Sequence, residues 1–89
     1  MKSILLDDFV ELFRQLPGTV RAQARKSYRL WKKNPRHPSL HFKRAHTKDP
    51  VYSVRISRGY RALGLLEDET IAWFWVGSHA AYDKILTQL

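Results

Sequence analysis

The chain has 89 residues, the length of one small domain, so we expect residues 1–89 to form a single unit. It contains no cysteine, which excludes disulfides, thiolate zinc sites and cysteine nucleophiles. No apolar run reaches the roughly 20 residues of a membrane helix, and acids follow the N-terminus where a signal peptide would be apolar. We therefore expect a cytoplasmic protein without a membrane partner.

Positive charge is concentrated in the middle of the chain. The formal net charge is +8, but residues 21–61 hold thirteen Lys and Arg against one Asp, a balance of +12, whereas residues 1–20 and 62–89 give −1 and −3. Such a block is typical of a protein that binds a polyanion, since each neutralised phosphate releases condensed counterions. The partners to expect are a nucleic acid or an acidic protein, although the cations of residues 25–33 alone would suit a solvated helix face.

Two helices are predicted first. Residues 6–16 place apolar side chains at helical spacing, and Pro17-Gly18 ends the pattern. A second helix follows from Thr19 to Lys33 and ends at Asn34-Pro35, because a residue before proline avoids the helical region. The short link predicts an antiparallel helical hairpin whose shared apolar face must be covered by the rest of the chain.

The second half alternates as strands do. Four strands are expected at 40–45, 51–57, 60–66 and 70–76, with turns at 48–50, 58–59 and 67–69, and Ser78 is expected to cap a helix over 79–88. The alternation of residues 51–57 predicts one face packed on helices and a wet face with Ser53 and Arg55. The fold class is therefore α+β: an N-terminal antiparallel helical hairpin packed on a four-stranded, mainly antiparallel sheet, with a short C-terminal helix.

Arg61 and His79 are the residues most suggestive of chemistry. Arg61 stands in an otherwise apolar strand, where an unpaired buried charge would cost several kcal/mol, so it must be salt-bridged or face a site. His79 lies near the start of the last helix, with Tyr82 three residues on and on the same side. Arg58, beside a turn glycine, is read as plain surface. No spacing of His, Asp or Glu supports a metal site.

The stretch VYSVRISRGYRALGLLEDETIAWFWVGSHAAYD resembles the RelE/ParE toxins of type II toxin–antitoxin systems. The shared pattern is an arginine-bearing strand, a tight turn, Y-R, a further apolar strand and G-x-H-x-x-Y. The resemblance implies a RelE-like fold and either a ribosome-dependent mRNA endoribonuclease or a ParE-like toxin that inhibits DNA gyrase. It also implies a cognate antitoxin as partner. A non-catalytic RNA-binding module is a third reading, and His79 favours RNA cleavage because ParE-like members tend to lack such a histidine.

Carried over residue by residue, the resemblance implies a site in which the catalytic residues are Arg61, His79 and Tyr82, and the phosphate-binding residues are Lys43, Arg44 and Arg55. His46 is added to the substrate-binding group, and is a second candidate after His79 for the acid or base, because it closes the first strand beside Lys43 and Arg44. RNA cleavage by the 2′-hydroxyl needs a base, cations for the phosphate charge and an acid for the leaving oxygen, which these side chains supply without a metal or other cofactor. The expected partners are the antitoxin, mRNA and the ribosome, and no small-molecule ligand is expected.

The N-terminus departs from the family pattern. Most relatives open with a β-strand at the sheet edge, whereas here only Ile4-Leu5-Leu6 precedes the first helix. The sequence therefore predicts that this strand is missing. The exposed edge would then be open to an antitoxin, by strand addition or by a helix laid in the groove.

Overall fold

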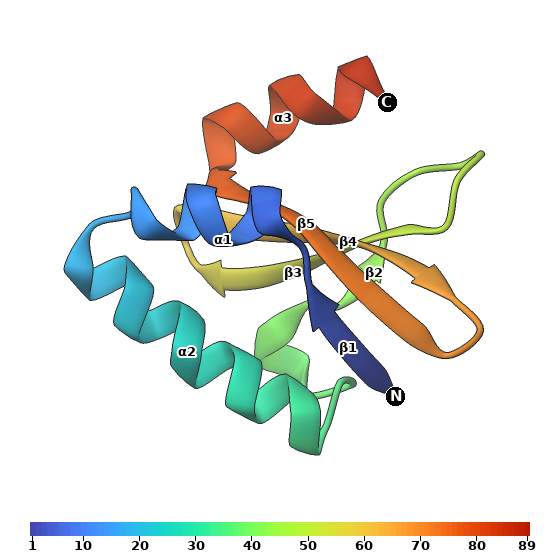
Figure 1. The fold of residues 1–89 in the computed structure, drawn as a ribbon, viewed down its shortest axis with the longest axis horizontal. Helices are drawn as coiled ribbons and strands as arrows, with labels where there is room; N and C mark the ends of the chain where they lie inside the picture. Colours follow the sequence, from blue (N-terminus) through green and yellow to red (C-terminus); the bar gives the residue numbers. More distant parts are fainter.

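Five strands form one sheet in a computed structural model that describes all 89 residues, and helices lie against it (Figure 1). The strand order is β1-β5-β4-β3-β2. The chain order is β1 (Lys2–Leu5), α1 (Asp7–Arg14), α2 (Gly18–Lys33), a 3-10 turn (Pro38–Leu40), β2 (Lys43–Arg44), β3 (Val51–Ser57), β4 (Tyr60–Glu67), β5 (Thr70–Ser78) and α3 (His79–Gln88). The predicted α+β class is confirmed, but the sheet has five strands rather than four.

The additional strand is β1, so the prediction of a missing N-terminal strand is wrong. Lys2 to Leu5 pair in parallel with Thr70 to Trp73 of β5, and Ser3 also shares a side-chain hydrogen bond with Tyr28 of α2. Four residues are too few to show a strand period, and the partner lies more than sixty residues away in the chain. The edge that a missing N-terminal strand would have left open is therefore occupied by β1, and the two edge strands of the sheet are β1 and β2.

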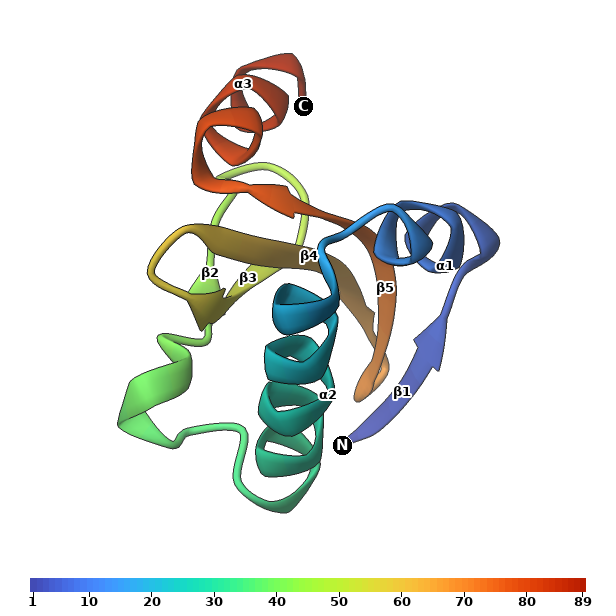
Figure 2. The ribbon, with the colours of Figure 1, turned by 90° about the vertical axis from the view of Figure 1, so that its left-hand side faces the viewer.

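The helices α1 and α2 follow each other closely in the chain but cover different parts of the sheet. Figure 2 shows them diverging from the turn that joins them, with α1 over β5 and α2 over β3. Leu16 and Val20 are buried at that turn, and Ala24 and Trp31 continue the buried stripe of α2. Each helix thus packs mainly on the sheet, and the two leave a gap between them. None of the three helices has the length and apolar character needed to cross a membrane.

The first expected strand, residues 40–45, is much shorter than predicted. Pro38 to Leu40 form a 3-10 turn, which His37 caps by accepting a hydrogen bond from the backbone N–H of Ser39, and His41 adopts a left-handed conformation with φ 46°. The chain therefore bends where the strand was expected to begin. Only Lys43 and Arg44 pair with β3.

The two faces of the sheet are set by β3, β4 and a bulge in β5. Val54 and Ala62 are buried against the helices, together with Trp73. Ser53 faces the other way yet is only 3% exposed, so the expectation that this face is wet is wrong there. The register of β4 and β5 shifts at Leu63/Gly64, which lets Trp73 pack on Trp31 of α2 while Trp75 packs on Tyr82 of α3.

Candidate functional site on β3, β4 and α3

Arg55 and Arg61 are directly opposite each other on β3 and β4, on the face of the sheet that does not touch α2. Paired residues of antiparallel strands project from the same face with their side chains about 5 Å apart at the Cβ atoms. Both arginines are half-buried. The structure therefore places two cations side by side in a partly desolvated position, where a phosphate could neutralise both.

The hydrogen bonds of Arg61 hold its side chain in the hairpin. Its Nη1 atom donates to three backbone oxygens, those of Ser57 at 2.6 Å, Tyr60 at 2.9 Å and Arg58 at 3.3 Å. The Nε and Nη2 atoms have no hydrogen-bond partner in the protein. Arg61 thus stabilises the turn through one nitrogen and leaves the donors on its other two nitrogens available for a ligand.

The electrostatics of this position favour a bound anion. Burial and then the charge of Arg55 lower the pKa of Arg61 from its ordinary value, while the nearby groups of Tyr82 and Asp83 oppose the shift. Arginine nevertheless keeps its proton in proteins. The repulsion between the two positive charges is therefore reduced by binding an anion, and not by loss of a proton from Arg61.

The start of α3 lies directly beside this pair. Arg61 pairs with Gly77 of β5, and His79 follows two residues later, with its backbone N–H donating to Gly59 O at 2.8 Å. Ser78 Oγ accepts a hydrogen bond from Ala81 N, so the predicted cap is present. This anchoring fixes the first turn of α3 to the β3–β4 hairpin and so sets the position of His79 relative to Arg61.

Three aromatic rings line the same side of the hairpin. Tyr82 lies between Trp75 and His79, with ring centroids 6.5 Å and 5.7 Å away. The Trp75 ring lies over the backbone of Gly77, where a β-carbon would stand 2.7 Å from the ring. A residue larger than glycine at position 77 would therefore force the ring to move. Flat rings beside cations are the arrangement on which unpaired nucleic-acid bases stack.

Asp83 is a member of this cluster that the sequence analysis missed. Its Oδ2 atom lies 3.3 Å from Nδ1 of His79, one helical turn away. The signal was present as an H-x-x-x-D spacing, which brings the two side chains together only if the helix begins at or before the histidine. Trp75 joins the cluster through the bulge in β5, which a regular strand pattern does not indicate.

The other predicted site residues do not all join the cluster. Lys43 pairs with Ser53 and so projects from the same face as Arg55, two residues along the neighbouring strand. Arg44 projects from the opposite face, and its Nε atom donates to His46 O at 2.9 Å. His46 turns into its own loop, where Nδ1 accepts from Asp49 N at 3.1 Å. Arg44 and His46 thus order the β2–β3 loop, and the structure does not bring them to Arg61.

No group of three or more His, Asp or Glu side chains is close enough together to hold a metal ion. The histidines outside the cluster have local structural surroundings. His37 caps the 3-10 turn, and His41 is exposed at its end. The side chains that the cluster brings together are thus one imidazole, two guanidinium groups and one phenol.

The sheet, the two diverging helices and the placement of α3 define a RelE-like toxin fold. A chain of the RelB-RelE antitoxin-toxin complex from Methanococcus jannaschii is 16% identical, with a TM-score of 0.74 over 92% of this chain and 96% of that chain. The isolated E. coli RelE toxin is 21% identical, with a TM-score of 0.62 over 99% of this chain and 98% of that chain. The RelE-RelB complex from Pyrococcus horikoshii OT3 gives 15% identity and 0.68 over 86% and 92%.

The family is established by sequence. A family model described as a ParE-like toxin domain matches residues 19–84, which is most of the chain. The protein therefore belongs to the ParE-like toxin domain family, within the RelE/ParE superfamily of toxins from toxin–antitoxin systems. Comparison with curated proteins gives no match.

Proposed function

We propose that the protein is a metal-independent endoribonuclease that cleaves mRNA on the ribosome and thereby blocks translation. The observation that supports this proposal best is that Arg55 and Arg61 lie opposite each other on one face of the sheet, beside the first turn of α3, which carries His79. Two cations and a histidine beside aromatic rings supply the groups that cleavage of an RNA backbone requires.

The reaction uses the nucleophile that RNA itself carries. The 2′-hydroxyl loses its proton as its oxygen attacks the adjacent phosphorus, the bond from phosphorus to the 5′-oxygen breaks, and that oxygen takes up a proton. Arg61 and Arg55 stabilise the charge that grows on the non-bridging oxygens. His79 transfers a proton, and Tyr82 stacks on a base or donates a hydrogen bond. Lys43 extends the cationic track along the same face.

We further propose a cognate antitoxin as the partner that keeps the toxin inactive. The similar chains from M. jannaschii and P. horikoshii were solved in complex with RelB. An acidic partner matches the +12 balance of residues 21–61, and it would compete with RNA for the same cations.

Inhibition of DNA gyrase is the second candidate function. The matching family model is described as a ParE-like toxin domain, which favours this alternative despite the likeness to RelE structures. Both activities can occur on one fold, so the two functions must be distinguished by the residues of the site. The gyrase alternative requires no proton-transfer residue and gives no role to His79.

Induction of the protein without an antitoxin tests the two candidates. For the endoribonuclease we expect protein synthesis to stop before DNA synthesis, and new mRNA 5′ ends to appear within minutes. His79→Ala and Arg61→Lys should each slow cleavage by about 100-fold or more, because proton transfer or bidentate phosphate binding is lost.

Arg58→Ala is the matched control for these variants. The Arg58 side chain is exposed beside the same turn, so its removal should leave cleavage unchanged. Circular dichroism on each variant confirms that the fold is retained. Full toxicity of folded His79→Ala, or arrest of replication ahead of translation, would rule out the endoribonuclease and support the gyrase alternative.

A further inference from the structure

The first strand of the chain presents an unpaired edge. β1 lies at one end of the strand order, with β5 as its only neighbour in the sheet. The N–H groups of Lys2 and Leu6 donate to carbonyl oxygens in and next to β5, at 2.9 Å and 3.0 Å. Because successive residues of a strand turn their backbone groups to opposite sides, the N–H and C=O groups of Ser3 and Leu5 point outward. The edge thus offers two donors and two acceptors to a further strand.

Apolar side chains accompany these backbone groups. Four of the five large apolar side chains that are exposed belong to residues 1–6, with Ile4 at 50% and Leu5 at 45%. β1 contains no proline, and its pairing with β5 has no bulge, although either feature would protect an edge strand. An exposed edge of this composition favours pairing with another strand.

The charges beside β1 make the strand complementary to itself in the antiparallel direction. Lys2 stands at its beginning, and Asp7 and Asp8 lie in the first turn of α1, just after its end. When Ile4 of one copy is opposite Ile4 of a second copy, Lys2 of each copy lies near the acidic first turn of the other. Two such strands therefore bring opposite charges together at both ends of the pair.

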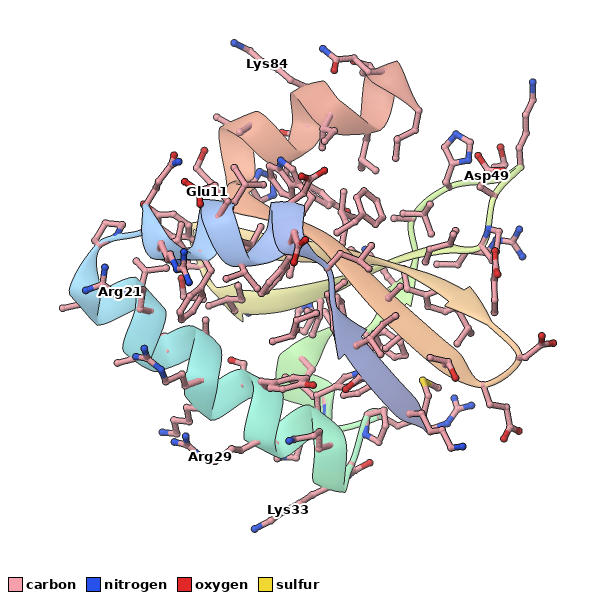
Figure 3. All side chains as sticks on the ribbon, in the orientation of Figure 1. Glu11, Arg21, Arg29, Lys33, Asp49 and Lys84 are labelled. Atoms are coloured by element: carbon pink, nitrogen blue, oxygen red, sulfur yellow. The ribbon has the colours of Figure 1, made fainter.

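The positive charge of the chain lies mostly away from this edge. The net charge of +8 opposes self-association, but the excess is in residues 21–61, whereas residues 1–11 contain one Lys against three acidic residues. The cationic strand β2 is at the opposite edge of the sheet. Figure 3 shows Arg29 and Lys33 of α2 pointing away from the sheet. A second copy that approaches β1 therefore does not face the cationic block.

We infer that two copies of this chain associate through antiparallel pairing of their β1 strands. The two-fold axis passes between the two Ile4 residues, perpendicular to the sheet, and Ser3 of each copy exchanges two backbone hydrogen bonds with Leu5 of the other. The two five-stranded sheets become one continuous sheet. So short a strand buries less than the roughly 800 Å² per partner of a stable interface, so the dimer is weak and forms at micromolar concentrations or above.

The dimer leaves the cluster around Arg61 open. With the axis perpendicular to the sheet, both copies turn the face that carries Arg55 and Arg61 to the same side. Five strand spacings separate the two β4 strands, which is roughly 24 Å along the sheet. The inference does not depend on the proposed function, because the contact uses no residue of the cluster.

A proline at position 3 tests the pairing with the full chain. Ser3→Pro removes an outward N–H and leaves the bonds to β5 in place, and Ser3→Ala is its matched control because both variants lose the hydrogen bond to Tyr28. In sedimentation equilibrium the unaltered chain and Ser3→Ala should approach twice the monomer mass of 10.5 kDa as concentration rises, whereas Ser3→Pro should stay monomeric. Equal masses for the two variants, both folded by circular dichroism, would overturn the inference.

An exchange of charges tests the direction of the strands. Lys2→Glu and Asp8→Lys each place like charges at both ends of the pair, so each alone should weaken dimerisation by about tenfold, and an equimolar mixture of the two should restore it. Asp49→Lys makes the same charge change as Asp8→Lys on the β2–β3 loop, which Figure 3 shows away from β1, and should alter dimerisation by less than about twofold. Failure of the mixture to restore the dimer would exclude this antiparallel register.

Hydrogen exchange of the backbone amides identifies the edge that is used. The N–H groups of Ser3 and Leu5 should become protected as concentration rises, whereas the protection of Arg61 should stay the same. A dimer with protection confined to other segments would overturn the inference. A monomer at every concentration up to about 1 mM would overturn it as well, and would leave the edge to a strand of a different protein.

Discussion

His79 and Asp83 form a pair whose geometry suits a proton-transfer residue and the group that orients it. The Nδ1 atom of His79 faces the carboxylate at 3.3 Å, which leaves Nε2 directed elsewhere. Contact of one imidazole nitrogen with a carboxylate favours the tautomer that holds its proton on that nitrogen. We propose Asp83 as a positioning residue for His79, and its charge also lies close enough to act on Arg61.

Replacement of Asp83 separates orientation from substrate binding. Asp83→Asn should lower kcat for RNA cleavage by about tenfold, because an amide no longer fixes the imidazole tautomer. KM should stay equal or fall, since a negative charge that repels RNA has been removed. Nitrogen NMR shifts of the His79 ring should change in parallel, and Lys84→Ala serves as the control. An unchanged kcat would contradict the role.

Arg61 shows why a residue-scale prediction from sequence had to stop at two alternatives. The strand pattern required either a structural partner or a site, and the structure shows the structural partners without excluding the site. Its Nη1 atom stabilises the turn carbonyls, while Nε and Nη2 stay free. Arg44 was assigned to the site by the family resemblance, and His46 by its position beside Lys43 and Arg44. Their side chains instead order a loop, which no pattern in the sequence indicates.

At the scale of the elements, Gly64 is packed closely against the side chains of Ile71 and Trp73. A β-carbon there would lie 2.6 Å from Cγ1 of Ile71 and 2.9 Å from Cε3 of Trp73. Gly64→Ala should therefore lower the free energy of unfolding by about 1–3 kcal/mol, measured in urea, because the buried neighbours must shift.

Gly59 provides the matched control for that prediction. A β-carbon at position 59 meets nothing within 4 Å, and no glycine of the chain has a positive φ. Gly59→Ala should change the free energy of unfolding by less than about 1 kcal/mol, with stabilisation expected from the stiffer unfolded chain. Equal losses in the two variants would show that packing around Gly64 is looser than described.

The elements predicted well are those with a local signal. Both N-terminal helices, α3 and the strands β3 to β5 have clear periodicity and turn residues, and their bounds agree with the structure within about two residues. The failures concern long-range pairing and irregular backbone. β1 exists through a distant partner, β2 is cut short by the left-handed His41, and the bulge in β5 separates Trp73 from Trp75.

On the scale of the whole molecule, cations are present on both faces of the sheet but serve different surfaces. Lys43, Arg55 and Arg61 share one face, whereas Arg14, Arg21 and Arg25 line a groove between α1 and α2 on the other. The positive block of residues 21–61 therefore contributes to two separate surfaces, and Arg14 adds to the second of them. Composition alone could predict a polyanionic or acidic partner. It could not predict that the cations lie on two opposite faces of the sheet.

Salt dependence measures how many cations the RNA site contributes. Three phosphate contacts on single-stranded RNA predict that log K falls with log salt at a slope of about −2. A 2′-deoxy oligonucleotide that cannot be cleaved, titrated by fluorescence anisotropy, gives the slope. Arg55→Ala should reduce its magnitude by roughly 0.7, and Arg25→Glu should leave it unchanged. A slope near zero would exclude this face as a phosphate-binding surface.

The parallel pairing of β1 with β5 joins the first strand made to the last. During synthesis Lys2 to Leu5 must wait until Thr70 to Trp73 have left the ribosome, and His79 follows later still. Chains generally fold as they emerge, but a sheet closed by such distant segments forms only at the end. The sheet therefore cannot be completed until residues 70–73 are free to pair with residues 2–5, which delays formation of the edge strand relative to the local β3–β4 and β4–β5 pairings.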